Sequence, residues 1–253
     1  MNAPKSERVS PKCIIPAVLA LMSLWAAAAL AAAPDVGMIT GLKGEVTYWN
    51  EAEKGQPAAV QAFMKVRQGD RFKLAAHAVL NVLYFNTGRQ ETWQGPRRLT
   101  AGPGASEAEG GGQPKVEMVS AKLAGKIKAA PLPLPRSNLQ FSGGIRTMGA
   151  QAQSPEATPA PQAVSGQKAK QEIAQARKVY REWRQKAEPE DFTPEMYLLS
   201  VLAEYGRYRE MDQVITEMRG QNPGDSALKQ LQTWVRAQMA QPSSQPSSRE
   251  RQD

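Results

Sequence analysis

Histidine and cysteine, which often serve in nucleophilic catalysis and zinc binding, are nearly absent from this chain. His77 is the only histidine and Cys13 the only cysteine. A Ser-His-Asp site would have to use His77, yet the chain has no G-x-S-x-G pattern to present a nucleophilic serine. One histidine and one cysteine are too few for a zinc site. We therefore expect no catalytic residue, no metal and no cofactor, and we interpret His77 as a loop residue beside a turn.

Paired carboxylates remain to be weighed, because two acids suffice for glycoside hydrolysis. Glu51 and Glu53 lie in a charged loop, and Asp70 and Glu91 lie at or near predicted turns. Apart from two nearby tryptophans, the sequence neighbours of these acids are not the apolar and aromatic residues that would raise the pKa of a carboxyl group or bind a sugar. We interpret all four as solvated turn acids. A polysaccharide hydrolase is the least favoured of the functions considered.

The N-terminal residues have the pattern of a secretory signal. Three basic residues precede an apolar run from Cys13 to Ala33 that is rich in Ala and Leu. The pattern predicts a signal peptide over residues 1–31, cleaved behind Ala29-Leu30-Ala31 and leading to the periplasm. Cys13 lies ahead of the apolar core, so lipid anchoring is not expected. An uncleaved inner-membrane anchor remains open, because Ile14 to Ala33 is nearly long enough to span a bilayer.

The charge of the chain is strongly positive, with a net value of +8 and an isoelectric point near 9.6. In a cytoplasmic protein this balance would suggest nucleic acid as a partner. For an exported chain we expect no nucleic acid, and a weak association with anionic envelope surfaces is the more plausible use of the charge. A solvated basic surface without a specific partner is the preferred interpretation.

Glycine and proline divide the chain after the predicted signal. They are concentrated between Gly102 and Gly166, which is the composition of a linker. We predict an all-β domain at 34–104, a Pro/Gly-rich linker at 105–166, a helical module at 167–240 and a disordered tail at 241–253. The fold class is thus multidomain, β followed by α.

Short apolar alternations separated by turns predict a β-sandwich or barrel in the first domain. Residues 78–85 are apolar on both faces, so we expect this strand to be central in its sheet. The predicted strands cover residues 36–42, 45–50, 59–66, 71–75, 78–85 and 89–94.

The linker contains segments with patterns of their own. Residues 116–130 have apolar residues at spacings that predict a short basic helix, which Gly125 weakens. The alternating Pro-Leu run at 131–135 predicts an extended, semi-rigid spacer. Residues 138–148 predict a further strand that joins the β domain.

The last module shows clear helical periodicity. A first helix has one apolar face between Ile173 and Ala187, and a second begins at Thr193-Pro194, a cap followed by proline at the first helical position. A third covers about 208–219, and a fourth contains Leu228 and Val235. Short helices joined by tight turns predict a small antiparallel array.

The β segment resembles the FecR-like domain of bacterial envelope proteins. The resemblance rests on Gly44-x-Val46, Val66-x-x-Gly69-Asp70-x-Phe72, the strand into Asn86-Thr87-Gly88, and Gly95-Pro96 before Leu99. It implies an all-β periplasmic domain. FecR itself has a cytoplasmic segment that controls a sigma factor, whereas only about a dozen residues precede the apolar run here.

The helical module resembles a tetratricopeptide repeat over about 192–225. Leu198, Leu202, Gly206, Tyr208, Ile215 and Pro223 match its spacing of paired helices, whereas Leu199 and Met211 depart from it. The resemblance implies a concave face that binds a peptide. In that register Met196, Ser200 and Glu204 face the concave side, and Tyr197 is an aromatic residue of the same hairpin that could line a peptide groove. These four are the candidate protein-binding residues. A helical hairpin of another type remains open.

These patterns favour an exported, non-enzymatic envelope protein that binds another envelope protein or a cell-wall polymer as an adaptor. Two alternatives stay open at this point. One is a membrane-anchored signalling component of the FecR type, and the other is the hydrolase with paired carboxylates.

Overall fold

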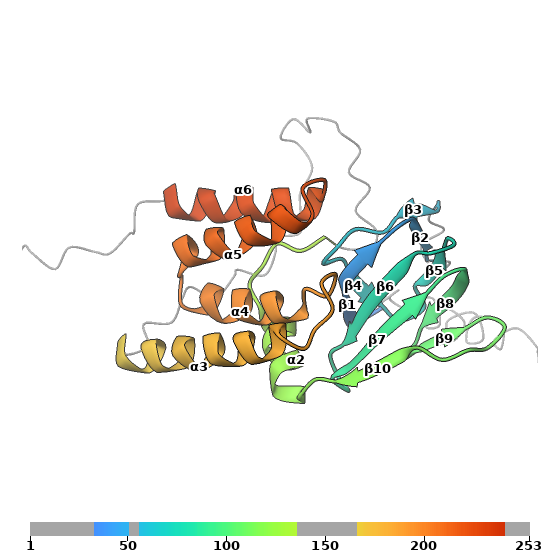
Figure 1. Ribbon diagram of the computed structural model, residues 1–253, viewed down its shortest axis with the longest axis horizontal. Coiled ribbons are helices and arrows are strands. Elements are labelled where there is room, and N and C mark those ends of the chain that lie inside the picture. Colours follow the sequence, from blue (N-terminus) through green and yellow to red (C-terminus); the bar gives the residue numbers. More distant parts are fainter. Residues whose placement is uncertain (1–32, 51–55, 136–165, 241–253) are drawn as a thin grey trace, which may run out of the picture. The chain divides into compact units, whose positions relative to one another are not determined.

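The computed structural model describes residues 33–50, 56–135 and 166–240 (Figure 1). The predicted signal peptide, the strand expected at 138–148 and the predicted tail lie outside these residues, as do Glu51 and Glu53. The chain divides into two compact units, Met1–Ala33 and Pro34–Asp253. All the elements below belong to the second unit. No helix within the described residues is both long enough and apolar enough to cross a membrane.

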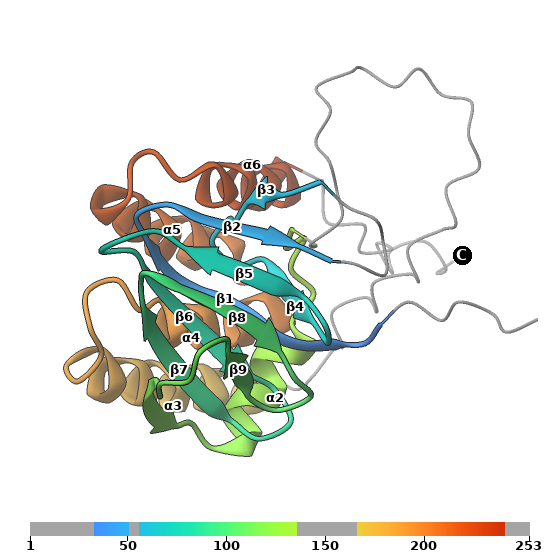
Figure 2. The ribbon, with the colours of Figure 1, turned by 90° about the vertical axis from the view of Figure 1, so that its right-hand side faces the viewer.

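Two five-stranded antiparallel sheets form the β part (Figure 2). The first, sheet A, has the order β10-β7-β6-β1-β4, and the second, sheet B, has the order β3-β2-β5-β8-β9. The strands of sheet A are β1 (Asp35–Lys43), β4 (Lys65–Arg67), β6 (Val79–Tyr84), β7 (Arg89–Gln94) and β10 (Lys115–Met118). Those of sheet B are β2 (Val46–Trp49), β3 (Ala58–Ala59), β5 (Arg71–Leu74), β8 (Arg97–Ala101) and β9 (Ser106–Ala108).

Strand β6 shows why sheet A is buried on both faces. Side chains alternate along a strand, so Leu80, Val82 and Tyr84 point one way and Leu83 the other. The first three pack in the core between the two sheets, with Phe72 and Leu99 of sheet B among its members. Leu83 belongs to a second core that includes the helices. The prediction that this strand is central is confirmed, since β6 is the middle strand of sheet A.

The strand predicted at 59–66 is wrong as a single element. Its two ends pair in different sheets, as β3 with β2 and as β4 with β1. Between them Phe63 has a positive φ of 60° and its side chain is fully buried. Phe63 packs in the core that contains the helices, whereas Val60 and Met64 pack between the sheets. The chain turns at Phe63 and passes from sheet B to sheet A there, so these residues cannot form one straight strand.

Asp70 and Glu91 are fully buried, so their interpretation as solvated turn acids is wrong. Asp70 accepts hydrogen bonds from Asn50 Nδ2 at 2.6 Å and from the Arg67 backbone N–H at 2.8 Å. Glu91 accepts from Arg89 Nε at 2.6 Å and Trp93 Nε1 at 2.9 Å, and from the backbone N–H of Ser106 at 3.1 Å. The Glu91 carboxylate therefore links β7 of sheet A to β9 of sheet B, and Asp70 links the residue after β2 of sheet B to β4 of sheet A. His77 lies exposed in the turn before β6, as predicted.

Five helices follow within the described residues, and the four predicted in the last module are confirmed. They are α2 (Ala121–Ala129), α3 (Gly166–Arg184), α4 (Thr193–Glu204), α5 (Tyr208–Gln221) and α6 (Ser226–Ala240). The short helix expected within the linker is α2, which Ser120 caps by accepting a hydrogen bond from the Leu123 N–H. Helix α4 is buried over all of Thr193–Ala203, because α2, α3, α5 and strand β1 surround it.

Residues 105–135 are packed against the rest of the unit, although their composition is that of a linker. They form β9, β10 and α2, and Val119, Ala124, Ile127 and Leu132 are buried. The run expected as a free spacer ends against sheet A, where the Lys65 N–H donates to the Pro135 carbonyl at 3.0 Å. Burial of its leucines explains the difference, since Leu132 and Leu134 contact the same core as the helices.

The outer face of sheet A and the helices share this core. Met38, Phe63, Leu83 and Phe85 of the β part pack with Phe192, Met196 and the apolar faces of α3 to α6. The rings of Phe63 and Phe192 are 6.0 Å apart, and the Phe192 N–H donates to the Thr40 carbonyl at 2.9 Å. The β part and the helices therefore form one body. Within it sheet A lies between sheet B and the helical layer (Figure 1).

Candidate functional site

The loop at 185–192, between α3 and α4, is organised by Arg184 at the last position of α3. Its guanidinium donates to the carbonyls of Asp191 at 2.5 Å, Ala187 at 2.9 Å and Glu188, and it pairs with Glu195 Oε2 at 3.2 Å. A planar group with five N–H donors suits this task, because one side chain satisfies several carbonyls at a helix end. Arg184 thus fixes the loop between two helices.

The end of strand β1 lies directly against this loop. Gly41 makes the approach possible, because a Cβ at that position would lie 2.3 Å from the Glu190 carbonyl oxygen and 2.6 Å from Asn81 Nδ2. Two residues further, Lys43 Nζ pairs with Glu190 Oε1 at 2.8 Å. The strand end and the loop are therefore held together by close backbone contact and by one ion pair.

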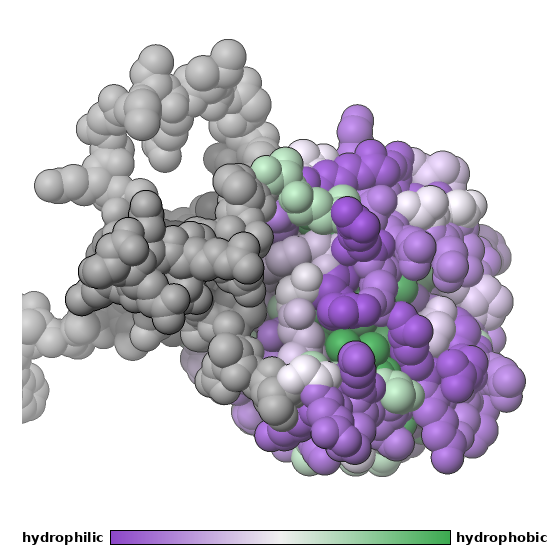
Figure 3. Space-filling model, turned by 90° about the vertical axis from the view of Figure 1, so that its left-hand side faces the viewer, coloured by the Kyte–Doolittle hydropathy of each residue, from purple (hydrophilic) through white to green (hydrophobic). Residues whose placement is uncertain are grey.

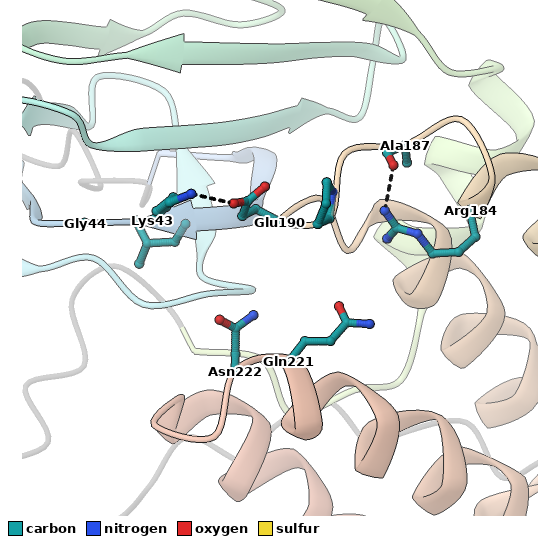
Figure 4. Close-up of a pocket in the computed structure, with 9 residues that line it drawn as sticks. Lys43, Gly44, Arg184, Ala187, Glu190, Gln221 and Asn222 are labelled. Atoms are coloured by element: carbon teal, nitrogen blue, oxygen red, sulfur yellow. Dashed lines mark hydrogen bonds and ion pairs between the residues drawn. The ribbon is translucent and has the colours of Figure 1, made fainter.

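A pocket opens at this junction and is completed by the C-terminal end of α5 (Figure 4). Its volume is about 690 Å³. The side chains of Gln221 and Asn222 extend from the helix end toward the space, opposite the Lys43–Glu190 pair (Figure 4). The lining residues are Leu42, Lys43, Gly44, Arg184, Ala187, Pro189, Glu190, Gln221 and Asn222.

The charges of the pocket stabilise one another. The hydrogen bond from Lys43 lowers the pKa of the Glu190 carboxyl, and the same bond raises the pKa of the Lys43 amine. Glu190 therefore stays ionised and is a poor proton acceptor near neutral pH. Lys43 stays charged, and its side chain is 62% exposed. The pair presents a cation and an anion to solvent at the edge of the pocket.

The pocket is lined by polar and apolar groups together. They combine one exposed ammonium, one guanidinium, one carboxylate and two side-chain amides with small apolar surfaces from Leu42, Ala187 and Pro189. The nine lining residues include no serine, cysteine or histidine that could act as a nucleophile. The described residues also contain no cluster of three metal-ligating side chains of the His, Cys, Asp and Glu types. Such donors and acceptors can recognise a ligand by hydrogen bonding.

The four residues predicted to bind a protein do not form a surface together. Met196 is fully buried, Tyr197 is 7% exposed and Ser200 is 2% exposed. The ring centroids of Tyr197 and Trp183 are 6.5 Å apart. Ser200 Oγ donates a hydrogen bond of 2.6 Å to the Met196 carbonyl. Helix α2 packs against α4, which α3, α5 and β1 also contact, so α4 is enclosed by its neighbours. The structure therefore contradicts an accessible binding role for these three residues.

Glu204 is the exception, because it is exposed at the end of α4. It pairs with Lys126 of α2, and Lys126 also lies 3.8 Å from Glu172 Oε2 of α3. Tyr208 packs at the side of the array, where its ring meets that of Trp234 edge-on at 6.0 Å. The part of the helical face visible in Figure 3 is mostly hydrophilic. It therefore offers no broad apolar surface for a partner.

Sequence reasoning missed the pocket residues, since they come from distant parts of the chain. Lys43 and Glu190 are 147 positions apart, and neither belongs to a recognisable motif. The Asn222-Pro223-Gly224 break predicted a helix end but gave no sign that this end faces strand β1. Only the packing of helices on sheet A brings these groups together.

Comparisons of the chain with models of protein families, with curated protein sequences and with solved structures gave no match.

Proposed function

We propose that this chain is an exported, non-enzymatic envelope protein that binds a partner at the junction pocket. The observation that carries the proposal is the pocket itself, which has a volume of about 690 Å³. Charged and amide groups line it, contributed by Lys43, Glu190, Gln221 and Asn222. These groups offer hydrogen-bond donors and acceptors. The lowered pKa of Glu190 keeps its carboxylate ionised. Recognition is the chemistry that such a set performs best.

The proposed partner is a segment of another envelope protein. A peptide backbone alternates N–H and C=O groups, which the amides of Gln221 and Asn222 and the Lys43–Glu190 pair match in kind. The described residues that line the pocket include no aromatic ring, the usual stacking surface for a sugar. A cell-wall polymer is therefore the second choice. The predicted signal peptide supplies the expected location, the periplasm, and the FecR-like pattern of the β part agrees with it.

The proposed binding role belongs to one body, not to the two separate modules that the sequence predicts. Because sheet A and the helices share a core, the adaptor would offer one composite surface instead of two independent ones. The resemblance of α4 and α5 to a tetratricopeptide repeat fits this proposal only as a scaffold. Helix α4 is enclosed by α2, α3, α5 and β1.

The test compares three forms of the unit Pro34–Asp253, which forms a compact body of its own. The pocket variant carries Lys43→Ala and Gln221→Ala. The matched control carries Lys73→Ala and Gln94→Ala, which remove the same two residue types from exposed positions of β5 and β7. Each form is immobilised and exposed to envelope extracts of a Gram-negative bacterium, and retained proteins and wall fragments are identified and titrated individually.

We expect at least one retained protein to bind the native unit and the control equally and the pocket variant at least tenfold more weakly. Equal binding to all three forms would remove the pocket from the proposal. Retention of wall fragments alone, with the same loss in the pocket variant, would make a polymer the ligand. If no form retains anything, the binding function itself fails.

A further inference from the structure

Strand β10 is an unusually open edge of sheet A. Its four residues are all exposed, although it pairs with β7 along its other side. Val116 is 38% exposed and Met118 is 69% exposed, and they are two of the three large exposed hydrophobic residues among those described. In Figure 1, β10 is the outermost strand of its sheet. An open edge with apolar side chains is a template for pairing with another strand.

The hydrogen bonds to β7 define which backbone groups of β10 are free to pair. Val119 N–H donates to the Gly88 carbonyl at 2.8 Å, in the same register that places Lys115 opposite Thr92. Hydrogen-bonded and non-hydrogen-bonded positions alternate along an antiparallel pair. Lys115 and Glu117 therefore bond to β7, whereas the N–H and C=O groups of Val116 and Met118 point outward.

The side chains of β10 alternate between the two faces of sheet A, with apolar residues on one face and charged residues on the other. Val116 and Met118 lie opposite Glu91 and Arg89, on the face of sheet A that is turned toward sheet B. Lys115 and Glu117 lie on the face turned toward the helices, where Lys115 Nζ contacts Glu188 Oε1 at 3.0 Å and Glu117 Oε1 of its own strand at 3.2 Å. A strand that pairs with this edge would thus meet apolar groups on one face and one charge of each sign on the other.

We infer that β10 is a dimerisation edge, at which two copies of the chain pair their β10 strands antiparallel about a two-fold axis at Val116. In this register Val116 lies opposite Val116 of the second copy, and both present outward N–H and C=O groups to each other. Lys115 of each copy then lies opposite Glu117 of the other copy, which gives two such pairs. These opposite charges occupy non-hydrogen-bonded positions, where facing side chains are closest.

The neighbouring registers of the strand pair are unfavourable because they leave backbone groups without partners or place like charges opposite each other. The outward-facing groups belong to even-numbered residues, so a shift by one position would leave them without partners. A shift that centres the axis on Glu117 places two carboxylates face to face. A shift that centres it on Lys115 places two ammonium groups face to face. Like charges directly opposite one another destabilise a strand pair. Charge complementarity therefore selects the Val116 register and selects a second copy as the occupant.

The joined strands would bury the apolar side chains that are now exposed. Val116 of each copy would meet its equivalent, and Met118 would lie opposite Pro114 of the second copy. The missing N–H of proline is no obstacle there, since the Pro114 carbonyl can still accept from the Met118 N–H. The two A sheets would become one continuous sheet across a two-fold interface, the commonest symmetry of soluble dimers.

The first test is the oligomeric state of the unit Pro34–Asp253, measured by sedimentation velocity over a wide concentration range. We expect a reversible monomer–dimer equilibrium for the native unit. Val116→Pro removes only an outward N–H and so costs no bond to β7, and we expect it to weaken the dimer at least tenfold. Glu117→Lys places like charges opposite each other and should weaken it similarly, whereas Lys115→Glu combined with Glu117→Lys should restore it.

The second test examines the register by cross-linking. The unit has no cysteine of its own, because the single cysteine of the chain is Cys13. In the proposed register, Val116→Cys brings two thiols within reach of a disulfide across the axis. Met118→Cys, at the more exposed position, places its thiols too far apart. We expect rapid covalent dimers from Val116→Cys and few from Met118→Cys.

Three outcomes would overturn the inference. They are a native unit that stays monomeric at the highest concentration, a dimer that Val116→Pro leaves unchanged, and equal cross-linking at both cysteine positions. Circular dichroism of each variant checks that β10 substitutions leave the fold intact. A folded Val116→Pro unit that still dimerises locates the interface elsewhere.

Discussion

Gln90 of strand β7 donates a hydrogen bond of 2.7 Å from its Nε2 atom to Oδ2 of Asp191, which lies 101 positions further along the chain. Both side chains are buried. The other oxygen of Asp191 accepts from the Thr193 N–H at 2.9 Å and from Thr193 Oγ1 at 2.5 Å. One carboxylate thus stabilises the start of α4 and ties it to sheet A. Its hydrogen bonds are complete only when sheet and helix are together.

Substitution of Phe192 by alanine should destabilise the β part and the helices together. Phe192 is 3% exposed and packs against Phe63, so the change leaves a cavity in the shared core. We expect the free energy of unfolding of the unit to fall by about 3–5 kcal/mol. Denaturant titrations followed by circular dichroism and by tryptophan fluorescence should show a single coincident transition. Met239→Ala, at a position that is 38% exposed, is the control and should cost no more than about 0.5 kcal/mol.

Substitution of Glu91 by glutamine should show that this acid is structural. The change replaces one carboxylate oxygen by an NH₂ group, which would then face the N–H donors of Arg89, Trp93 or Ser106. We expect a loss of about 3 kcal/mol in the free energy of unfolding, because a buried ion pair is broken from one side. The exposed Glu107→Gln is the matched control. If Glu91→Gln is as stable as Glu107→Gln, the hydrogen-bond network around Glu91 contributes little.

Two glycine-to-alanine substitutions should have opposite signs. Gly88 has a positive φ of 66°, and a Cβ there would lie 2.1 Å from the Val119 carbonyl oxygen. Gly88→Ala should therefore cost about 2 kcal/mol or more, and it should loosen the link from β7 to β10. Gly125 lies within α2 with no atom within 4 Å of its added Cβ, so Gly125→Ala should stabilise the unit by about 0.5–1 kcal/mol. Thermal unfolding of both variants distinguishes these outcomes, and equal shifts would contradict them.

The pH dependence of stability should reveal Glu195. Burial raises the pKa of this carboxyl above its ordinary value of 4.5, and the charge of Arg184 only partly opposes the shift. The native state then holds this proton more tightly than the unfolded chain does. Stability therefore falls as the pH rises from below the unfolded pKa to above the folded one. Relative to Glu195→Gln, the native unit should lose stability over that window, which begins near 4.5.

Glu172→Gln is the control of opposite sign. The hydrogen bond from Tyr205 lowers the pKa of Glu172, so its contribution is present above the unfolded pKa and is lost as the pH falls through the folded one. Relative to Glu172→Gln, the native unit should therefore gain stability as the pH rises through this lower window. Free energies of unfolding measured in urea at a series of pH values follow both differences. Two differences of the same sign would refute the assignment.

The sequence predicted local structure well where one pattern dominates. The apolar residues on both faces of 78–85 predicted the middle strand of sheet A, and the Thr193-Pro194 start and Gly206 predicted the limits of α4 closely. These signals are local because side-chain alternation and helix capping depend on neighbours in the chain. They failed at 59–66, where the chain turns at Phe63 and its two ends pair in different sheets.

The candidate site illustrates the opposite case. The prediction for Met196 and Ser200 rests on the register of a repeat, and that for Tyr197 rests on the aromatic residues around the hairpin; both assume that one face of the hairpin is open. Helix α4 is instead enclosed by α2, α3, α5 and β1, and α2 lies within a segment whose overall composition is that of a linker. Likewise, the acids Asp70 and Glu91 are close to turns in sequence yet buried in space. Composition and spacing do not indicate which distant segment will cover a side chain.

By itself the sequence determined the order of β and α elements, the scarcity of nucleophiles and metal ligands, and the positions of most turns. These follow from residue types and from contacts over a few positions. Only the tertiary structure decided that sheet A and the helices share one core, that the Lys43–Glu190 pair borders a pocket, and that β10 is left as an open edge. The physical reason is that burial and pairing depend on residues far apart in the chain, whose meeting is decided by the free energy of the whole fold.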